Sequence, residues 1–229
     1  MNQQTRDAVE LMLNDRLFLY SLMHTLFGRE PDEELLGILT APHTGEAFEL
    51  LSEENTDMPA RTVRFLAEIR EKQKDPLFLE QVKDEYTRLF IGPGSLVAPP
   101  WESVYGQQDA LLFQKSTLEV REVYRHFGLL PEGYPHVADD SLALELHFMA
   151  LLAQRSLDAF YAGREEELAR TLTGSTDFLK KHLLVWIPKF TERMQGAKSG
   201  MLYPQMCLAL EGFLKRDSEI LDEIHREYI

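Results

Sequence analysis

Apolar residues recur every three or four positions along most of this chain. In one early segment they fall at Val9, Met12, Leu13, Leu17 and Tyr20, whereas the strict alternation of apolar and polar residues that is typical of strands is essentially missing. The pattern therefore predicts an all-α protein. Helices are expected at about residues 5–27, 31–39, 44–53, 59–74, 76–91, 107–127, 140–161, 164–173, 176–195 and 202–227.

Prolines divide this pattern into separate helices. Pro31, Pro59 and Pro76 each stand where a helix can begin, because proline is tolerated in the first turn and disrupts later turns. Pro188 lies inside a helical stretch, where it removes one amide donor and crowds the carbonyl of Leu184, so we expect a kink. No repeat of solenoid length is found, and residues 1–229 are expected to form a single globular bundle of about ten helices.

One segment interrupts the helices, and we call it the strap: residues 91–106, IGPGSLVAPPWESVYG. Gly92 and Gly94 allow backbone angles that other residues avoid. Pro93, Pro99 and Pro100 fix their own angles and keep the preceding residue out of a helix. The strap is therefore expected to be stiff and non-helical.

The strap ends in two aromatic residues close to a carboxylate. Trp101 and Tyr105 flank Glu102, Ser103 and Val104. A rigid loop that carries Trp and Tyr is typical of a recognition surface, because these rings give contact area at little cost in entropy. The same composition also fits a loop that plugs its own core with Trp101, so both alternatives stay open.

A second polar cluster precedes an apolar helix in the stretch HVADDSLALELHFMALL, residues 136–152. Asp139 or Asp140 can cap this helix, with Ser141 as a competitor, because short polar side chains accept hydrogen bonds from the free amides of a first turn. Glu145 lies on the flank of the apolar stripe. A carboxylate at such a place is either paired in the interior or lies on the rim of a groove.

Composition narrows the range of partners. The net charge is −14, from 38 acidic and 24 basic residues, which disfavours nucleic acid and anionic lipid as partners. Charged residues interrupt the first helical segment, so no secretory leader is expected, and no apolar run is long enough to span a bilayer. We therefore expect a cytoplasmic protein without stable membrane insertion. The single cysteine, Cys207, has apolar neighbours and is expected to be a buried free thiol.

Motifs for catalysis or metal binding are missing from the sequence. The Glu-x-x-His pairs of helical di-metal proteins, the HExxH zinc motif, the GxSxG nucleophile elbow and a full glycine-rich phosphate loop do not occur. Asp222 and His225 show a related spacing once, among acidic residues that are typical of a surface. The absence of these motifs argues against an enzyme, and we expect no catalytic residues and no metal or cofactor of the protein's own.

Three stretches carry a resemblance to a known family: EYTRLFIGPGSLVAPPWESVYG, LALELHFMALL and FLKKHLLVWIPKF. They resemble the TorD/DmsD/NarJ family, the all-helical cytosolic chaperones of complex molybdenum enzymes. The similarity extends over most of the chain and looks closest to the DmsD branch, because of LFIGPG, PPWESVY and STLEVREVYRHFGL.

The resemblance implies a protein that recognises the twin-arginine leader of the catalytic subunit of a molybdopterin-containing reductase. It would hold this subunit back from export while the molybdopterin cofactor is inserted. The implied partners are the leader and the body of that subunit, with components of the Tat translocase as further candidates. The resemblance also allows either a monomer or a helix-swapped dimer, with a hinge near residues 129–140.

Residues for leader recognition are also implied by the resemblance. The matching positions are Phe90, Gly92, Pro93, Pro100, Trp101, Ser103, Val104 and Tyr105, and Asp140 matches the aspartate of the family's Pro-Asp-His box. In this chain Asp139 replaces the proline of that box and Ser141 replaces its histidine, so a role of the histidine does not carry over.

A twin-arginine leader joins two arginines to a moderately apolar stretch, so its binder needs anions beside an apolar groove. A guanidinium can form a forked pair of hydrogen bonds with a carboxylate and can stack on an aromatic ring. We therefore expect the strap to line a peptide-binding crevice, with Trp101 and Tyr105 as its aromatic wall. The candidate carboxylates are Glu102, Asp139, Asp140 and Glu145. The alternative is a general assembly scaffold for a leaderless molybdoenzyme subunit, as in NarJ-like members.

Overall fold

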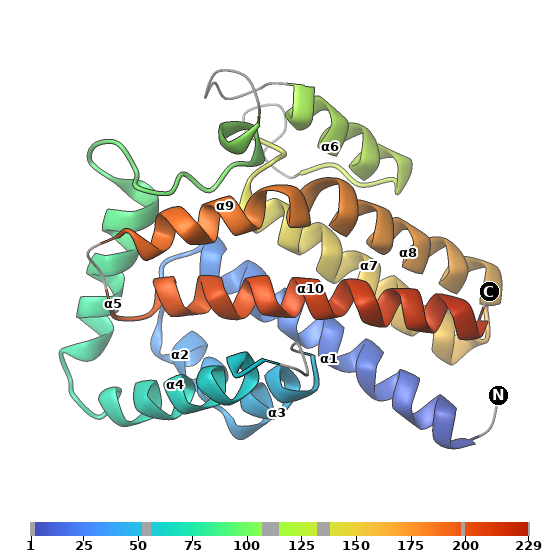
Figure 1. Cartoon of the computed structure of the whole chain (residues 1–229), viewed down its shortest axis with the longest axis horizontal. Helices are drawn as coiled ribbons and strands as arrows, with labels where there is room; N and C mark the ends of the chain where they lie inside the picture. Colours follow the sequence, from blue (N-terminus) through green and yellow to red (C-terminus); the bar gives the residue numbers. More distant parts are fainter. Residues whose placement is uncertain (1–2, 52–55, 107–114, 132–137, 198–199, 229) are drawn as a thin grey trace.

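The computed structural model describes the chain except for residues 1–2, 52–55, 107–114, 132–137, 198–199 and 229 (Figure 1). Within the described part, the secondary structure is helical apart from one isolated β-bridge, which confirms the all-α prediction. The α-helices are α1 (Gln3–Gly28), α2 (Glu33–Leu39), α3 (Pro42–Leu50), α4 (Met58–Lys72), α5 (Phe78–Tyr86), α6 (Lys115–His126), α7 (Leu142–Ala162), α8 (Glu165–Phe178), α9 (Leu184–Gln195) and α10 (Tyr203–Tyr228).

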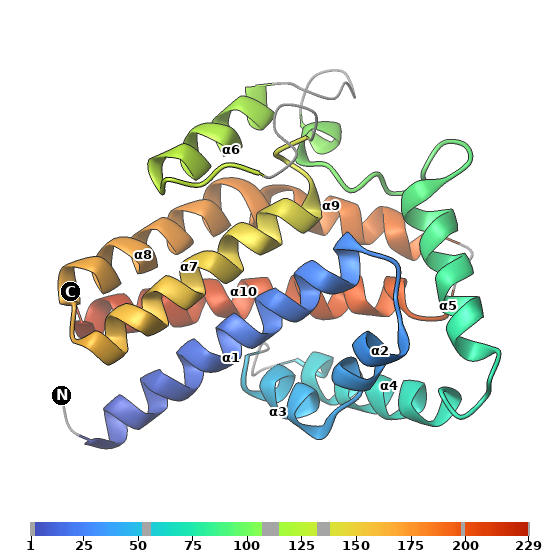
Figure 2. The same cartoon turned by 180° about the vertical axis from the view of Figure 1, so that it is seen from behind.

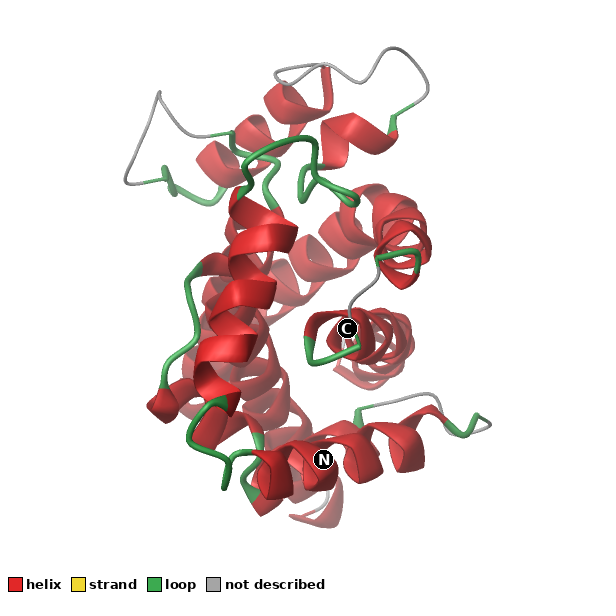
Figure 3. Cartoon of the chain, turned by 90° about the vertical axis from the view of Figure 1, so that its left-hand side faces the viewer, coloured by secondary structure: helices red, strands yellow, loops and turns green. Residues whose placement is uncertain are grey.

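Long helices form the centre of the molecule. Helix α1 packs along α7, α7 packs along α8, and α10 packs against α8 and α9. Helices α2, α3 and α4 lie on one side of this bundle, and α6 lies on the opposite side (Figures 1 and 2). Figure 3 views the bundle from the end where α5 lies and shows α10 nearly end-on between the other helices. Helix α1 begins and α10 ends at the other end of the bundle (Figure 1).

Local signals explain where several helices begin and end. Asp32 caps α2 by accepting a hydrogen bond from the amide of Leu35 at 2.8 Å, and Pro59 lies in the first turn of α4. Gly163 ends α7 in the left-handed region, with φ of 65°. Of the predicted helix at 107–127, residues 107–114 lie outside the described part and the remainder forms α6.

The predicted break between residues 173 and 176 is wrong. Helix α8 continues to Phe178, and a π-helical turn, Leu179–Leu183, joins it directly to α9. This turn lies immediately before Leu184, the residue whose carbonyl Pro188 would crowd in a regular helix. In Figure 1 the chain changes direction where α8 meets α9, as we expect for the kink.

A buried ion pair joins the first and last helices. The guanidinium of Arg16 on α1 contacts the carboxylate of Asp217 on α10 with two nitrogens, and both side chains are fully buried. The hydroxyl of Tyr20 donates to the same carboxylate at 2.6 Å. Three donors therefore satisfy Asp217 in an interior where an unpaired charge would be costly.

The remaining core is apolar and aromatic. Cys207 is fully buried, which confirms the prediction of an inert thiol, and burial raises the pKa of this thiol well above its ordinary value. Among the described residues, no helix combines the length and the apolar character needed to cross a membrane. The candidate hinge near residues 129–140 includes residues 132–137, which lie outside the described part.

Candidate functional site

The strap is bound through its backbone to the start of α7. Gly92 and Gly94 have φ of 98° and 118°, the left-handed values that glycine permits. Further along, Trp101 and Ser141 form an antiparallel bridge. Beside it, the amide of Glu102 donates to the carbonyl of Asp140 at 3.0 Å. The end of the strap is therefore fixed against the start of α7.

The cap of α7 is Ser141 rather than either neighbouring aspartate. Its hydroxyl oxygen accepts from the amide of Leu144 at 3.4 Å, and its backbone is extended. The default expectation that Asp139 or Asp140 provides this cap is therefore wrong. Both aspartates are fully buried and have other partners.

Asp140 is the point at which the strap, α6 and α7 meet. Its carboxylate accepts from the amide of Ser103 in the strap at 2.9 Å and from the hydroxyl of Thr117 on α6 at 3.0 Å. Asp139 binds Arg121 of α6, whose Nη2 lies 2.6 Å from its carboxylate. The two aspartates therefore hold α6 and the strap against the start of α7.

Two glutamates continue this polar cluster into the bundle. Glu102 lies 2.9 Å from Nδ1 of His182, and Glu145 accepts from the indole of Trp186 at 2.9 Å. Burial, and then the negative charge of Glu102, raise the pKa of Glu145 well above its usual value. The negative charge of Asp140 acts in the same direction, so burial and its acidic neighbours all disfavour the ionised form of Glu145.

The four predicted carboxylates thus face inward in this conformation. Each is at most 9% exposed, and each contacts a group of the protein itself. Asp139 and Glu145 each keep one oxygen without a hydrogen-bond partner, but these oxygens are buried, so an incoming guanidinium cannot reach them in this conformation. The sequence alone could not show that these carboxylates face inward, because some of their donors lie on α6 and α9, in distant parts of the sequence.

The two aromatic residues of the strap differ in how far they are buried. Trp101 is half-buried and keeps an accessible face, whereas Tyr105 is buried and stacks on Trp186 with ring centroids 5.4 Å apart. The expectation that Tyr105 forms an open aromatic wall is therefore wrong for this conformation. Phe90 is also buried and packs against Tyr203. The other predicted positions are exposed at Pro93, half-buried at Gly92, Pro100 and Val104, and buried at Ser103.

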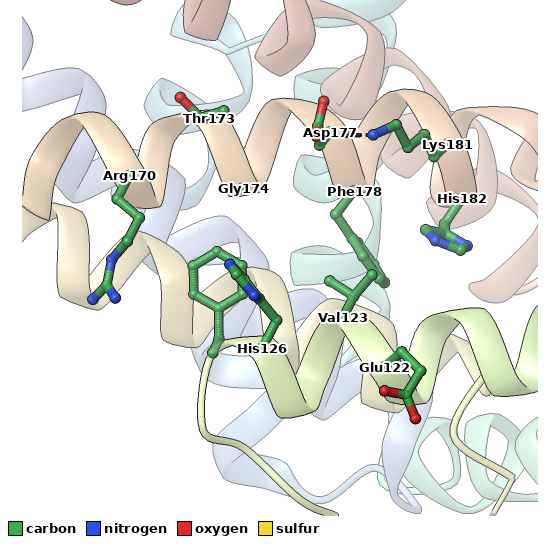
Figure 4. A pocket seen from close by; sticks show the side chains of 11 residues that line it. Glu122, Val123, His126, Arg170, Thr173, Gly174, Asp177, Phe178, Lys181 and His182 are labelled. Carbon is green, nitrogen blue, oxygen red and sulfur yellow. Dashed lines mark hydrogen bonds and ion pairs between the residues drawn. The ribbon is translucent and has the colours of Figure 1, made fainter.

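A groove lies beside this cluster, between α6 and the helix formed by α8 and its π-helical turn (Figure 4). Its volume is about 480 Å³, and an adjoining hollow of about 570 Å³ shares four of its residues. We call the two together the α6–α8 groove. Its lining residues are Leu118, Glu119, Glu122, Val123, His126, Phe127, Arg170, Thr173, Gly174, Asp177, Phe178, Lys181 and His182.

The α6–α8 groove has an apolar floor and a charged rim. Val123 and Phe178 face each other across it (Figure 4). Leu118, which lines the adjoining hollow, is 55% exposed. On the rim, Asp177 is paired with Lys181 at 2.8 Å on the solvent-exposed side of the helix. Such a surface suits an apolar peptide that also carries charge.

The strap supports this groove from behind rather than lining it. The groove is lined by residues of the helices, and the strap reaches it through Glu102, which binds the groove residue His182. The expectation that strap residues line a peptide-binding crevice therefore stays a prediction, and it does not apply to this groove. One signal for the groove is visible in the sequence, namely the apolar positions of α6 within STLEVREVYRHFGL.

Gly174 of α8 lies close against the ring of Phe127 in the lining of the groove. A β-carbon at this position would lie 2.9 Å from Cε2 of Phe127 and closer still to the tip of that ring. We expect Gly174→Ala to lower the free energy of unfolding by about 1–3 kcal/mol, because the buried ring must move. Urea unfolding followed by circular dichroism measures this change.

Gly212→Ala in α10 is the matched control, because a β-carbon there meets no atom within 4 Å. It should raise the free energy of unfolding by about 0.5–1 kcal/mol through helix propensity alone. Equal stabilisation by both alanines would show that Phe127 is not seated against α8.

Metal binding finds no support among the described residues. No three of their histidine, cysteine, aspartate or glutamate side chains gather closely enough to hold an ion. Within that part of the chain, the site is a groove of apolar and charged side chains that suits binding.

Comparisons with known proteins agree on a class of chaperones. A family model described as the nitrate reductase delta subunit matches residues 53–192. The chaperone protein TorD of Vibrio cholerae is 27% identical over 221 residues, which cover 96% of this chain and 97% of that protein. The Tat proofreading chaperone DmsD of Salmonella typhi is 32% identical over 113 residues, 49% of this chain and 48% of that one.

Among solved structures, a redox enzyme maturation protein from Archaeoglobus fulgidus aligns with a TM-score of 0.48 at 21% identity, over 90% of this chain and 94% of that chain.

Proposed function

Because the chain belongs to the TorD/DmsD family, within the nitrate reductase delta subunit family, we propose that it is a cytoplasmic maturation chaperone for a molybdenum-containing reductase. It binds the twin-arginine leader of the catalytic subunit and keeps that subunit from export until its molybdopterin cofactor is in place. The relatives TorD and DmsD are chaperones, which supports a binding role rather than a catalytic one.

The α6–α8 groove carries this proposal. Its floor offers apolar side chains, among them Leu118 and Val123, to the moderately apolar stretch of a leader. A peptide that covers this floor removes exposed apolar surface from water, and that burial is the main source of affinity.

Acidic residues on the rim can receive the leader's arginines. Glu122 and Asp177 form ion pairs with Arg125 and Lys181 on their own helices. Exposed pairs of this kind contribute little stability, so each carboxylate can exchange its partner for a guanidinium at small cost. The net charge of −14 adds attraction at long range and makes the association rate sensitive to salt.

The predicted peptide-binding residues then have two roles in this proposal. Trp101 keeps an accessible face and is the strap's candidate for direct contact with the leader. The buried carboxylates hold α6 at the correct distance from α8, because Asp139 and Asp140 bind Arg121 and Thr117 of that helix.

Leader binding can be tested on the groove floor. We expect Leu118→Glu to weaken binding of a synthetic twin-arginine leader about tenfold or more, because a charge would face the apolar stretch of the peptide. Leu77→Glu is the matched control, since Leu77 is 64% exposed and lies outside the groove. Isothermal titration of each folded variant measures the dissociation constant.

The leader itself provides the second arm of this experiment. Replacing Arg-Arg by Lys-Lys should weaken binding to the wild-type protein about tenfold, because lysine cannot form a forked pair of hydrogen bonds. Equal affinity of both leaders would show that the arginines are not recognised through forked pairs of hydrogen bonds. If the wild type retains only a leaderless reductase subunit from its host, the protein is an assembly scaffold and the leader proposal fails.

A further inference from the structure

A second groove lies on another part of the surface, where the first half of α1 meets α3. It is open to solvent and has a volume of about 800 Å³. We call it the α1–α3 groove, and it shares no residue with the α6–α8 groove. Its lining residues are Asp7, Glu10, Leu11, Asn14, Asp15, Leu17, Phe18, Ser21 and His43.

The charge of the residues that line this groove is negative. Three of its lining residues are acidic, and none of the described lining residues is a lysine or an arginine. Glu46 on α3 adds negative charge close to Asp15, since its charge acts on that carboxylate. A cationic group would therefore be attracted to this place.

Asp15 has a weak partner for a residue so little exposed. It is only 4% exposed, and the basic side chain near its carboxylate is His43, whose Nε2 lies 3.7 Å away, too far for a hydrogen bond. Asp217 of α10 shows the contrast, because its buried carboxylate accepts from Arg16 and Tyr20 of α1. Asp15 lines the open groove, so a ligand that enters the groove can donate hydrogen bonds to its carboxylate.

The walls of the groove suit a flat cation with an apolar neighbour. The rings of Phe18 and His43 pack together with centroids 4.7 Å apart, which gives an aromatic surface beside Asp15. Leu11 is 51% exposed at the same groove and can receive an apolar side chain. A guanidinium can stack on such rings while it donates two hydrogen bonds to a carboxylate.

We propose that the α1–α3 groove binds an arginine side chain in a peptide segment of a partner protein. The guanidinium donates to Asp15 and stacks beside Phe18, and the residue next to the arginine packs on Leu11. Charge complementarity selects a basic segment, and the fork of donors selects arginine over lysine. This binding site does not depend on leader recognition at the α6–α8 groove.

The test is a titration of the full-length protein with a short dye-labelled peptide that contains one arginine followed by leucine. Fluorescence anisotropy gives the dissociation constant. The second peptide carries citrulline in place of arginine, which keeps the shape and removes the charge. We expect Asp15→Asn to weaken binding of the arginine peptide about tenfold, and the citrulline peptide to bind the wild type about tenfold more weakly.

Two control variants test whether the peptide binds at the α1–α3 groove. Glu49→Gln removes one acid from α3 outside the groove and should leave the dissociation constant unchanged. Leu118→Glu alters the other groove and should also have no effect on this peptide. Thermal unfolding of Asp15→Asn shows whether this variant is folded, so that a loss of peptide binding can be assigned to the missing carboxylate.

Three outcomes would overturn the proposal. They are no saturable binding of the arginine peptide up to about 1 mM, equal binding of the citrulline peptide, and equal losses from Asp15→Asn and Glu49→Gln. If Leu118→Glu abolishes binding of the arginine peptide and Asp15→Asn does not, the peptide binds in the α6–α8 groove. That result would end the proposal for the α1–α3 groove and leave leader binding intact.

Discussion

Asp217→Ala is expected to lower the free energy of unfolding by about 3–5 kcal/mol, the range observed when one partner of a buried ion pair is removed. The substitution leaves the guanidinium of Arg16 fully buried without its counter-charge, and it also deprives the hydroxyl of Tyr20 of its acceptor. Chemical denaturation in urea, followed by far-ultraviolet circular dichroism, measures the change. A lowered midpoint with an unchanged slope identifies a loss of stability in a fold that is otherwise intact.

Asp222→Ala is the matched control on the same helix. Asp222 pairs with Lys180 at 2.8 Å, and both side chains are 48% exposed. An exposed pair of this kind contributes between about 0 and 1 kcal/mol. If Asp217→Ala and Asp222→Ala lower the free energy of unfolding by similar amounts, the pair between Arg16 and Asp217 is not shielded from water. Arg16→Met with Asp217→Leu should recover much of the loss, because a matched apolar pair leaves no buried charge.

Asp140→Ala is expected to have the second largest effect, a loss of about 3 kcal/mol in the free energy of unfolding. The carboxylate is fully buried and accepts from the amide of Ser103 and the hydroxyl of Thr117. Alanine would leave both donors without a partner and would leave a small cavity at the junction of the strap, α6 and α7. The same urea experiment measures the loss, and limited proteolysis of the strap reports its detachment.

Asp140→Asn separates the hydrogen bonds from the charge. The asparagine carbonyl can accept from the amide of Ser103, and its amide can donate to the hydroxyl oxygen of Thr117. We expect it to lose about 1 kcal/mol or less. A folded Asp140→Asn protein that no longer binds the leader would show that the negative charge itself acts on the ligand. An Asp140→Ala protein as stable as the wild type would show that this carboxylate does not hold the strap, α6 and α7 together.

Local sequence signals predicted much of the fold, because helix periodicity and proline and glycine positions act over a few residues. The positive φ angles of Gly92 and Gly94 and the helical character of the chain follow from such signals. The break predicted near residue 174 is wrong because a glycine inside a helical pattern has the local signature of an interruption. In the structure Gly174 stays helical and makes room for the ring of Phe127.

The candidate site was harder to predict, because its geometry depends on partners far apart in the chain. Glu102 meets His182 across 80 positions, and Glu145 meets Trp186 across 41. The sequence pattern around Glu145 allowed this carboxylate either to pair in the interior or to lie on the rim of a groove. In the structure it is fully buried, because of tertiary packing that the sequence pattern does not contain. The α6–α8 groove forms between helices whose contact no local signal encodes.

The ion pair between Arg16 and Asp217 also bears on how the protein is made. Arg16 leaves the ribosome well before the residue that neutralises it, because Asp217 lies 201 positions later, in α10. Until α10 emerges, the nascent chain holds a charged group at the position of its future core and cannot close the bundle around it. Closure of this bundle is therefore deferred until α10 has been translated, and fragments that end before α10 are expected to be substrates for proteases.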